Sequence, residues 1–173
     1  MRIFLVGFMG SGKTYTGKGL AQLLDLPFID LDDYIEEKEG MTIKSVFNNK
    51  GEAYFRELER NCLHEMTQFE AGIISCGGGT PCFFDNMKWI NQNGFSIYLK
   101  AAPILLTQRL LPEMDHRPVL KGHNEKSLEN FITQKLQERT VFYEMASVII
   151  EQDQLQEDIL VHLQNHIKNI IGH

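Results

Sequence analysis

The 173-residue sequence lacks the features that mark several common classes of protein. Its longest apolar runs fall well short of the roughly 20 residues that a transmembrane helix needs, and glycine interrupts its apolar start too early for a signal peptide. Its three cysteines form no CxxC pair, which favours reduced thiols over a disulfide framework. With 17 basic and 23 acidic residues and a net charge of −6, it also lacks the basic excess that nucleic acids and membrane surfaces attract. We therefore expect a cytoplasmic protein that binds neither.

Linkers, internal repeats and low-complexity tracts are missing too, and a 43% hydrophobic content suits one compact domain. Brief apolar segments typical of buried strands alternate with segments of helical periodicity. The expected strands span residues 2–6, 28–29, 72–76, 95–99 and 147–150, and the expected helices span residues 13–24, 30–39, 51–69, 103–111, 125–143 and 155–171. This alternation predicts an α/β fold in which helices cover both faces of a central parallel sheet of about five strands.

A phosphate-binding loop stands between the first expected strand and the first expected helix. Residues Gly7–Thr14 match the pattern GxxxxGK[ST]. In such a loop, backbone N–H groups and the helix N-terminus cradle phosphates, the lysine (Lys13) reaches the β- and γ-phosphates, and the hydroxyl of Thr14 coordinates Mg²⁺. The context favours this interpretation over a glycine-rich turn that merely reverses the chain, and it predicts a three-layer P-loop NTPase fold.

Two further absences narrow the class. The sequence holds neither an NKxD segment that reads guanine nor an LSGGQ-like signature, and it is short for a separate output domain. These absences favour a small-molecule kinase. A different small-metabolite or nucleotide kinase, and a non-catalytic ATP-binding module, remain as alternatives.

Acidic residues follow the second expected strand, where a magnesium-directing group is needed. The strand at residues 72–76 ends in glycines and carries no acid, so Asp30 and Asp32 are the acids available at the ligand-binding edge of the sheet. Helix capping is the alternative role for both of them.

Arg56 and Glu59 lie three residues apart and so share one helix face. A carboxylate that engages one side of a guanidinium leaves its other donors for an anion, although an ordinary surface ion pair is the alternative. Gly77–Gly79 is either a loose turn or a place where a ligand approaches bare backbone.

Six motifs, in order along nearly the whole chain, together resemble the shikimate kinase family, which is related to the nucleoside monophosphate kinases. They are Gly7–Thr14, Asp30–Asp32, Gly51–Glu59, Gly77–Gly79, Arg117–Leu120 and Glu138–Tyr143. The resemblance implies transfer of the γ-phosphate of ATP to the 3-hydroxyl of shikimate, with Mg²⁺, in aromatic amino-acid biosynthesis. It also implies one kinase domain over residues 1–173, with a substrate-binding helical region at about 31–60 and a mobile lid at about 112–124. We further expect a monomer.

The same resemblance assigns roles to individual residues. In the acceptor site, Arg56 and Arg139 would hold the shikimate carboxylate, Gly78 and Gly79 would offer backbone N–H groups, and Asp32 would orient or deprotonate the reacting hydroxyl. Glu59 would hold Arg56. The catalytic residues implied are Lys13, Asp32 and Arg117.

On the donor side, Arg117 is implied as a lid residue that reaches the phosphates, and Arg109 as the residue that stacks on adenine. Thr14 and, through water, Asp30 would hold the metal. The implied ATP-binding residues are Gly10, Ser11, Gly12, Lys13, Thr14, Tyr15, Arg109 and Arg117. The chain departs from the family at Tyr15, where a smaller or β-branched residue is commoner, and in the lid, where His116 and acids replace basic residues.

Overall fold

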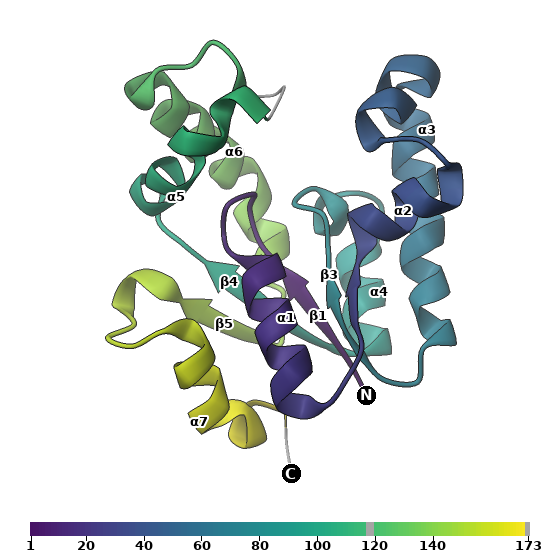
Figure 1. Cartoon of the computed structure of the whole chain (residues 1–173), viewed down its shortest axis with the longest axis vertical. Helices are drawn as coiled ribbons and strands as arrows, with labels where there is room; N and C mark the ends of the chain where they lie inside the picture. Colours follow the sequence, from purple (N-terminus) through teal and green to yellow (C-terminus); the bar gives the residue numbers. More distant parts are fainter. Residues whose placement is uncertain (117–119, 172–173) are drawn as a thin grey trace.

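The computed structural model describes residues 1–116 and 120–171, which form an open sheet covered by helices on both faces (Figure 1). All pairings in the sheet are parallel, and the strand order is β2-β3-β1-β4-β5. The strands are β1 (Arg2–Val6), β2 (Phe28–Asp30), β3 (Gly72–Ser75), β4 (Phe95–Lys100) and β5 (Val148–Glu151). The expected α/β class and five-stranded parallel sheet are confirmed.

Seven helices are seen in the described part of the chain, and six of them correspond to expected helices. They are α1 (Lys13–Leu24), α2 (Leu31–Glu39), α3 (Ile43–Glu65), α4 (Asn86–Asn93), α5 (Pro103–Leu110), α6 (Glu125–Tyr143) and α7 (Ile159–Ile171). Short 3₁₀ turns span Met66–Gln68, Thr80–Cys82, Leu111–His116 and Gln152–Gln154. The sequence did not predict α4, a short helix with few apolar residues.

The side chains of β1 alternate between the two faces of the sheet, as the pleat of a strand requires. Ile3 and Leu5 pack in a core cluster with side chains of α1 and α7. Phe4 and Val6 pack in a second cluster, with side chains of α2, α3 and α4. Because both faces of the strand are covered, its run of apolar residues is continuous, as in other parallel sheets.

Helix α3 begins eight residues before the expected start, and Gly51 interrupts it with a φ of 82°. That left-handed conformation suits glycine, which has no Cβ to clash with the backbone. At the start of the helix, the Thr42 side chain accepts a hydrogen bond from the N–H of Ser45. The extra turns bring Phe47 against Phe55, with 4.5 Å between ring centroids. This aromatic pair forms one wall of a cavity described below.

The segment at residues 112–124 contains more regular structure than its polar, proline-broken sequence predicts. Part of it belongs to the 3₁₀ turn Leu111–His116, and Leu120 is fully buried beside Leu128 and Ile132 of α6. The segment therefore contributes apolar area to the core at Leu120. Arg117 lies outside the described residues, and the mobility of the lid stays a prediction.

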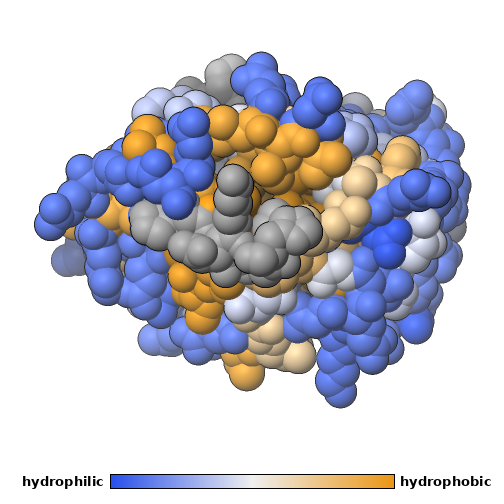
Figure 2. All heavy atoms as spheres, turned by 90° about the horizontal axis from the view of Figure 1, so that it is seen from below, coloured by the Kyte–Doolittle hydropathy of each residue, from blue (hydrophilic) through white to orange (hydrophobic). Residues whose placement is uncertain are grey.

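The face opposite the loop that follows β1 is seen from below in Figure 2. Hydrophobic residues gather near the middle of this face and hydrophilic residues surround them. Within residues 1–116 and 120–171, none of the helices combines the length and apolar character needed to span a bilayer.

Gly94, between α4 and β4, packs too closely against β1 to accept a side chain. A Cβ there would lie 2.6 Å from the backbone oxygen of Arg2 and 2.6 Å from the ring of Phe4. Because the backbone of a central strand cannot move aside cheaply, we expect Gly94→Ala to lower the free energy of unfolding by about 1–3 kcal/mol. Denaturation in urea, followed by circular dichroism, measures the loss.

Gly72→Ala is the matched control, because the nearest neighbour of its Cβ would be the Pro27 oxygen at 3.4 Å, an ordinary contact. If Gly94→Ala proves as stable as this control, the packing described at Gly94 is wrong.

Candidate active site

The loop between β1 and α1 has the curled backbone expected of a phosphate-binding loop. Gly7, Gly10 and Gly12 adopt positive φ angles of 146°, 78° and 88°, which lets successive N–H groups point inward. The ammonium group of Lys13 donates hydrogen bonds to the backbone oxygens of Gly7 (2.9 Å) and Phe8 (3.0 Å). The side chain of Lys13 thus folds back over the phosphate-binding loop.

Asp30 caps a helix and also contacts the phosphate-binding loop. Its Oδ1 accepts a hydrogen bond of 3.1 Å from the N–H of Asp32 and caps α2. Its Oδ2 accepts one of 3.3 Å from the hydroxyl of Thr14 in the phosphate-binding loop. These two hard oxygen ligands fit Mg²⁺, which takes few protein ligands and shares its coordination with phosphates and water. Within the described ranges, no group of three or more His, Cys, Asp or Glu side chains could hold a metal by itself.

Asp32 is the carboxyl group whose pKa is most strongly shifted in this region. Its pKa is raised from 3.8 to about 6, first by burial and then by the negative charges of Asp30 and Glu59, against a lowering effect of Lys13. A carboxyl group that titrates near neutral pH can accept a proton from a reacting hydroxyl.

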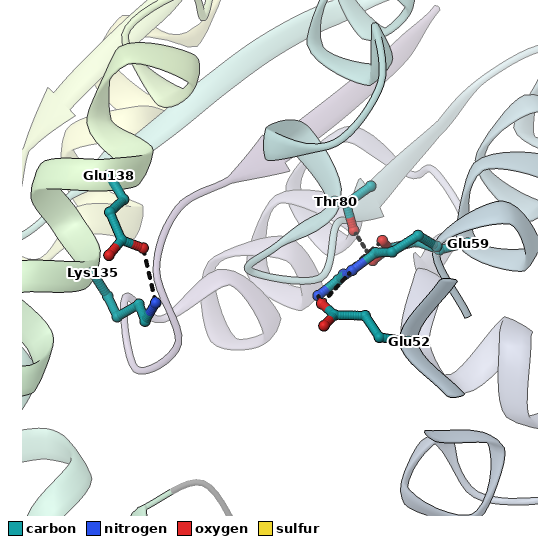
Figure 3. Close-up of polar contacts among 6 residues, drawn as sticks. Glu52, Glu59, Thr80, Lys135 and Glu138 are labelled. Carbon is teal, nitrogen blue, oxygen red and sulfur yellow. Dashed lines mark hydrogen bonds and ion pairs between the residues drawn. The ribbon is translucent and has the colours of Figure 1, made fainter. Parts of the chain in front are cut away.

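Arg56 lies at the side of a cavity of about 470 Å³ and is fixed from several directions. Its Nη1 donates to Glu59 Oε2 at 2.9 Å, its Nη2 donates to Glu52 Oε1 at 3.3 Å, and its guanidinium lies 3.9 Å from the ring centroid of Phe83. Glu59 is 1% exposed, and its other oxygen accepts a 2.6 Å hydrogen bond from Thr80 (Figure 3). The Arg56–Glu59 contact is therefore no ordinary surface ion pair.

Helix α6 forms the opposite side of the same cavity. Arg139 lines it with its guanidinium 5.5 Å from the Phe8 ring centroid, and Lys135 lines it one helical turn earlier. The hydroxyl of Tyr143 donates a 2.5 Å hydrogen bond to the oxygen of Gly78 and ties α6 to the glycine turn. Arg56 and Arg139, 83 residues apart in the sequence, thus border one cavity.

The turn Gly77–Gly79 is tight rather than loose. A Cβ on Gly77 would stand 2.8 Å from Asp32 Oδ1, and a Cβ on Gly79 would stand 2.8 Å from Arg56 Nη1. A side chain at Gly77 or Gly79 would have to displace these polar atoms, which favours glycine at both positions.

A second cavity, of about 510 Å³, lies on the other side of that turn. It contains Lys13, Thr14 and Asp30. The two cavities share four lining residues, Met9, Asp32, Gly77 and Gly78. A group bound at the phosphate-binding loop and a group bound between the arginines would therefore meet at Asp32.

A third cavity, of about 350 Å³, adjoins the loop on the side of β5 and α7. Arg109 borders it, and its Nη1 donates to the Gly10 oxygen (3.3 Å) and to Gln152 Oε1 (3.0 Å). The Tyr15 hydroxyl donates to Asp158 Oδ2 at 3.3 Å across the same cavity. Arg109 and Tyr15, both predicted to bind ATP, therefore line the same cavity.

Sequence reasoning missed four site residues, namely Thr80, Lys135, Gln152 and Asp158. The sequence contained a signal that could have identified two of them. Thr80 directly follows the glycine turn, and Lys135 stands four residues before Arg139 on a predicted helix and so shares its face. Gln152 and Asp158 reach the site only because β5 and α7 pack beside α1, which no local pattern reveals. Arg117 is not among the described residues, so the site is described without it.

This sheet order, with a phosphate-binding loop after β1 and an adjoining cavity lined by two arginines, defines a P-loop phosphotransferase. A family model described as shikimate kinase matches residues 9–168. The chain belongs to the shikimate kinase family.

Individual relatives agree with that assignment. A curated shikimate kinase of Bacteroides thetaiotaomicron is 48% identical over 157 residues, which cover 91% of this chain and 90% of that protein. The crystal structure of shikimate kinase from Bacteroides thetaiotaomicron superposes with a TM-score of 0.89 at 43% identity and covers 98% of this chain and 97% of that one. Shikimate kinase from Acinetobacter baumannii, in complex with shikimate, gives a TM-score of 0.82 at 33% identity over 98% of this chain and 92% of that one.

The raised pKa of Asp32 predicts a pH-dependent effect on stability. Because the folded protein binds this proton more tightly than the unfolded chain, Asp32 favours folding most below pH 3.8, and that contribution is lost as the pH rises through about 6. Asp32→Asn removes the negative charge that is buried close to Asp30 and Glu59. We expect it to raise the melting temperature at pH 8 by about 2–4 °C, and by less at pH 5. Scanning calorimetry at both pH values measures the difference.

Asp33→Asn, an exposed position on the same helix, removes the same formal charge and should show a smaller effect. Equal melting-temperature gains for Asp32→Asn at pH 5 and pH 8 would mean that Asp32 is an ordinary carboxylate.

Proposed function

We propose that the protein is an ATP-dependent kinase that phosphorylates the 3-hydroxyl of shikimate and produces shikimate 3-phosphate and ADP for aromatic amino-acid biosynthesis. The observation that carries this proposal is the meeting of two cavities at Asp32, Gly77 and Gly78, one beside a phosphate-binding loop and one between two arginines. The named relatives, and the Acinetobacter baumannii structure that contains shikimate, support this choice of acceptor.

ATP would lie along α1, with its phosphates in the loop at residues 7–14 and its base in the cavity beside β5. Gly10, Ser11 and Gly12 would offer backbone N–H groups to the phosphates. Arg109 would stack on the adenine, and Tyr15 would close that side of the pocket. The 3.0 Å contact of Arg109 with Gln152 supports this role, because it holds the guanidinium at the cavity wall.

Mg²⁺ would be held by the hydroxyl of Thr14 and, through water, by Asp30. The 3.3 Å hydrogen bond between these side chains supports the pair. When bound, the ion supplies charge neutralisation at the β- and γ-phosphates.

The acceptor would enter the cavity between α3 and α6 with its carboxylate toward Arg56 and Arg139, whose planar guanidinium groups match a carboxylate. Gly78 and Gly79 would present N–H groups to it. Its reacting hydroxyl would then face Asp32 at the boundary of the two cavities.

The reaction follows from that placement. The 3-hydroxyl oxygen forms a bond to the γ-phosphorus, the bond from that phosphorus to the β–γ bridging oxygen breaks, and Asp32 accepts the hydroxyl proton. Lys13 stabilises charge on the transferring group, and Arg117 would do so from the lid at residues 112–124. Most of the rate enhancement then comes from positioning and charge neutralisation.

We infer that residues 1–173 act as one kinase domain and as a monomer, with the acceptor held by the helical region at residues 31–60. We also infer a cytoplasmic location. The three free cysteines support it, since thiols stay reduced in that compartment.

A coupled assay with ATP, Mg²⁺ and several acceptors tests the proposal. We expect phosphorylation of shikimate with a kcat/KM at least about 100-fold above that for quinate, AMP or an analogue of shikimate without the carboxylate, because each lacks part of the required match. Equal or faster phosphorylation of AMP would favour a nucleotide kinase. No phosphorylation of any acceptor would favour the non-catalytic module.

The two arginines give the proposal a quantitative test. We expect Arg56→Ala and Arg139→Ala each to raise the KM for shikimate about 10- to 100-fold, since each removes a charge-assisted contact of about 1.5–3 kcal/mol. The KM for ATP should change less than about threefold. Steady-state kinetics with each substrate varied in turn gives both values.

Arg60→Ala is the control, because Arg60 lies on α3 one turn after Arg56 and pairs with Asp85 at 3.6 Å, outside the acceptor cavity. Equal losses for ATP and shikimate in the Arg56 and Arg139 variants would show that these arginines only maintain the fold.

A further inference from the structure

The acceptor cavity has a third cation that lies outside the motifs shared with the family. Lys135 lines it from α6, four residues before Arg139. Side chains at this spacing occupy the same helix face, with about 5–6 Å between their Cβ atoms. A ligand held by Arg139 would therefore lie within reach of Lys135.

The charges around the cavity are unevenly balanced. On the α3 side, two carboxylates neutralise Arg56, from Glu59 at 2.9 Å and from Glu52 at 3.3 Å. On the α6 side, no carboxylate of the described residues forms an ion pair with Arg139. The positive potential that attracts an anionic acceptor therefore comes mainly from Arg139 on α6.

Lys135 has a partner that it can leave easily. Its ammonium group lies 2.8 Å from Glu138 Oε2, and the two side chains are 35% and 50% exposed. Exposed pairs of this kind contribute little to stability, and the flexible lysine stem lets its charge move between partners. Figure 3 shows the Lys135–Glu138 pair on α6, across from Glu52 and Glu59 on α3.

We propose that Lys135 is a specificity-determining residue of the acceptor site, which leaves Glu138 and binds the carboxylate of the incoming acceptor together with Arg139. Glu138 then competes with the acceptor for Lys135 and sets the affinity. This inference rests on the proposed function, because it requires a small acceptor that carries a carboxylate.

Two variants should change the affinity for shikimate in opposite directions. Lys135→Met removes the cation, and we expect it to raise the KM for shikimate about 5- to 20-fold. Glu138→Gln removes the competitor, and we expect it to lower that KM about two- to fivefold. In both, kcat and the KM for ATP should stay within about twofold of wild type, since the contact is the same before and during the transfer.

Lys126→Met is the matched control. Lys126 is an exposed lysine of the same helix and does not line the cavity, so its variant loses the same net charge. Its KM for shikimate should stay close to that of wild type.

The carboxamide of shikimate separates a contact with the carboxylate from a general packing effect. For this neutral acceptor, the KM of Lys135→Met should equal that of wild type within about twofold, because there is no charge to lose. Titration calorimetry with shikimate and with the carboxamide gives the same comparison without turnover.

Equal KM increases for shikimate and for the carboxamide in Lys135→Met would overturn the inference, because Lys135 would then be structural. It would also fall if Glu138→Gln weakened shikimate binding, or if Lys135→Met matched Lys126→Met. Wild-type protein that neither binds nor phosphorylates shikimate would contradict the proposed function itself. An active wild type with an unchanged Lys135→Met contradicts only the role of Lys135.

Discussion

A turn without side chains, Gly77–Gly79 after β3, separates the phosphate-binding loop from the acceptor cavity. Asp32 and Arg56 approach it so closely that a Cβ on Gly77 or Gly79 would stand 2.8 Å from one of their polar atoms. Because the sheet order places β3 beside β1, this turn also lies next to the loop that holds Lys13. A side chain at Gly77 or Gly79 would displace Asp32 or Arg56 from this boundary between the two cavities, on which the proposed arrangement of donor and acceptor depends.

Three carboxylates gather around the turn, and their surroundings give them different roles. Glu59 is buried between Thr80 and Arg56, and Asp30 caps α2 while it accepts a hydrogen bond from Thr14. Burial first, and then the nearby charges of the other two, raise the pKa of Asp32 to about 6. The same burial and neighbouring charges that destabilise ionised Asp32 suit it to accept a proton from a hydroxyl. A stability cost and a catalytic capability therefore have one physical origin.

Much of the fold and part of the site could be predicted from the sequence because the signals are local. The phosphate-binding loop needs glycines and a lysine at fixed spacing, and Arg56 and Glu59 share a helix face by their separation alone. Features that depend on tertiary contacts were missed or mispredicted. Leu120 is buried although it lies in the expected mobile lid, because α6 presents Leu128 and Ile132 to it. Asp158 reaches Tyr15 only because α7 packs beside α1.

If the two cavities meet at Asp32, the γ-phosphoryl group passes from ATP to the acceptor in a single displacement, with no phosphorylated enzyme between them. The most direct measurement uses ATP made chiral at the γ-phosphorus with oxygen isotopes, followed by configurational analysis of the shikimate 3-phosphate formed. A single in-line displacement predicts inversion at phosphorus. Retention of configuration would require two successive displacements through a protein side chain and would contradict the shared boundary.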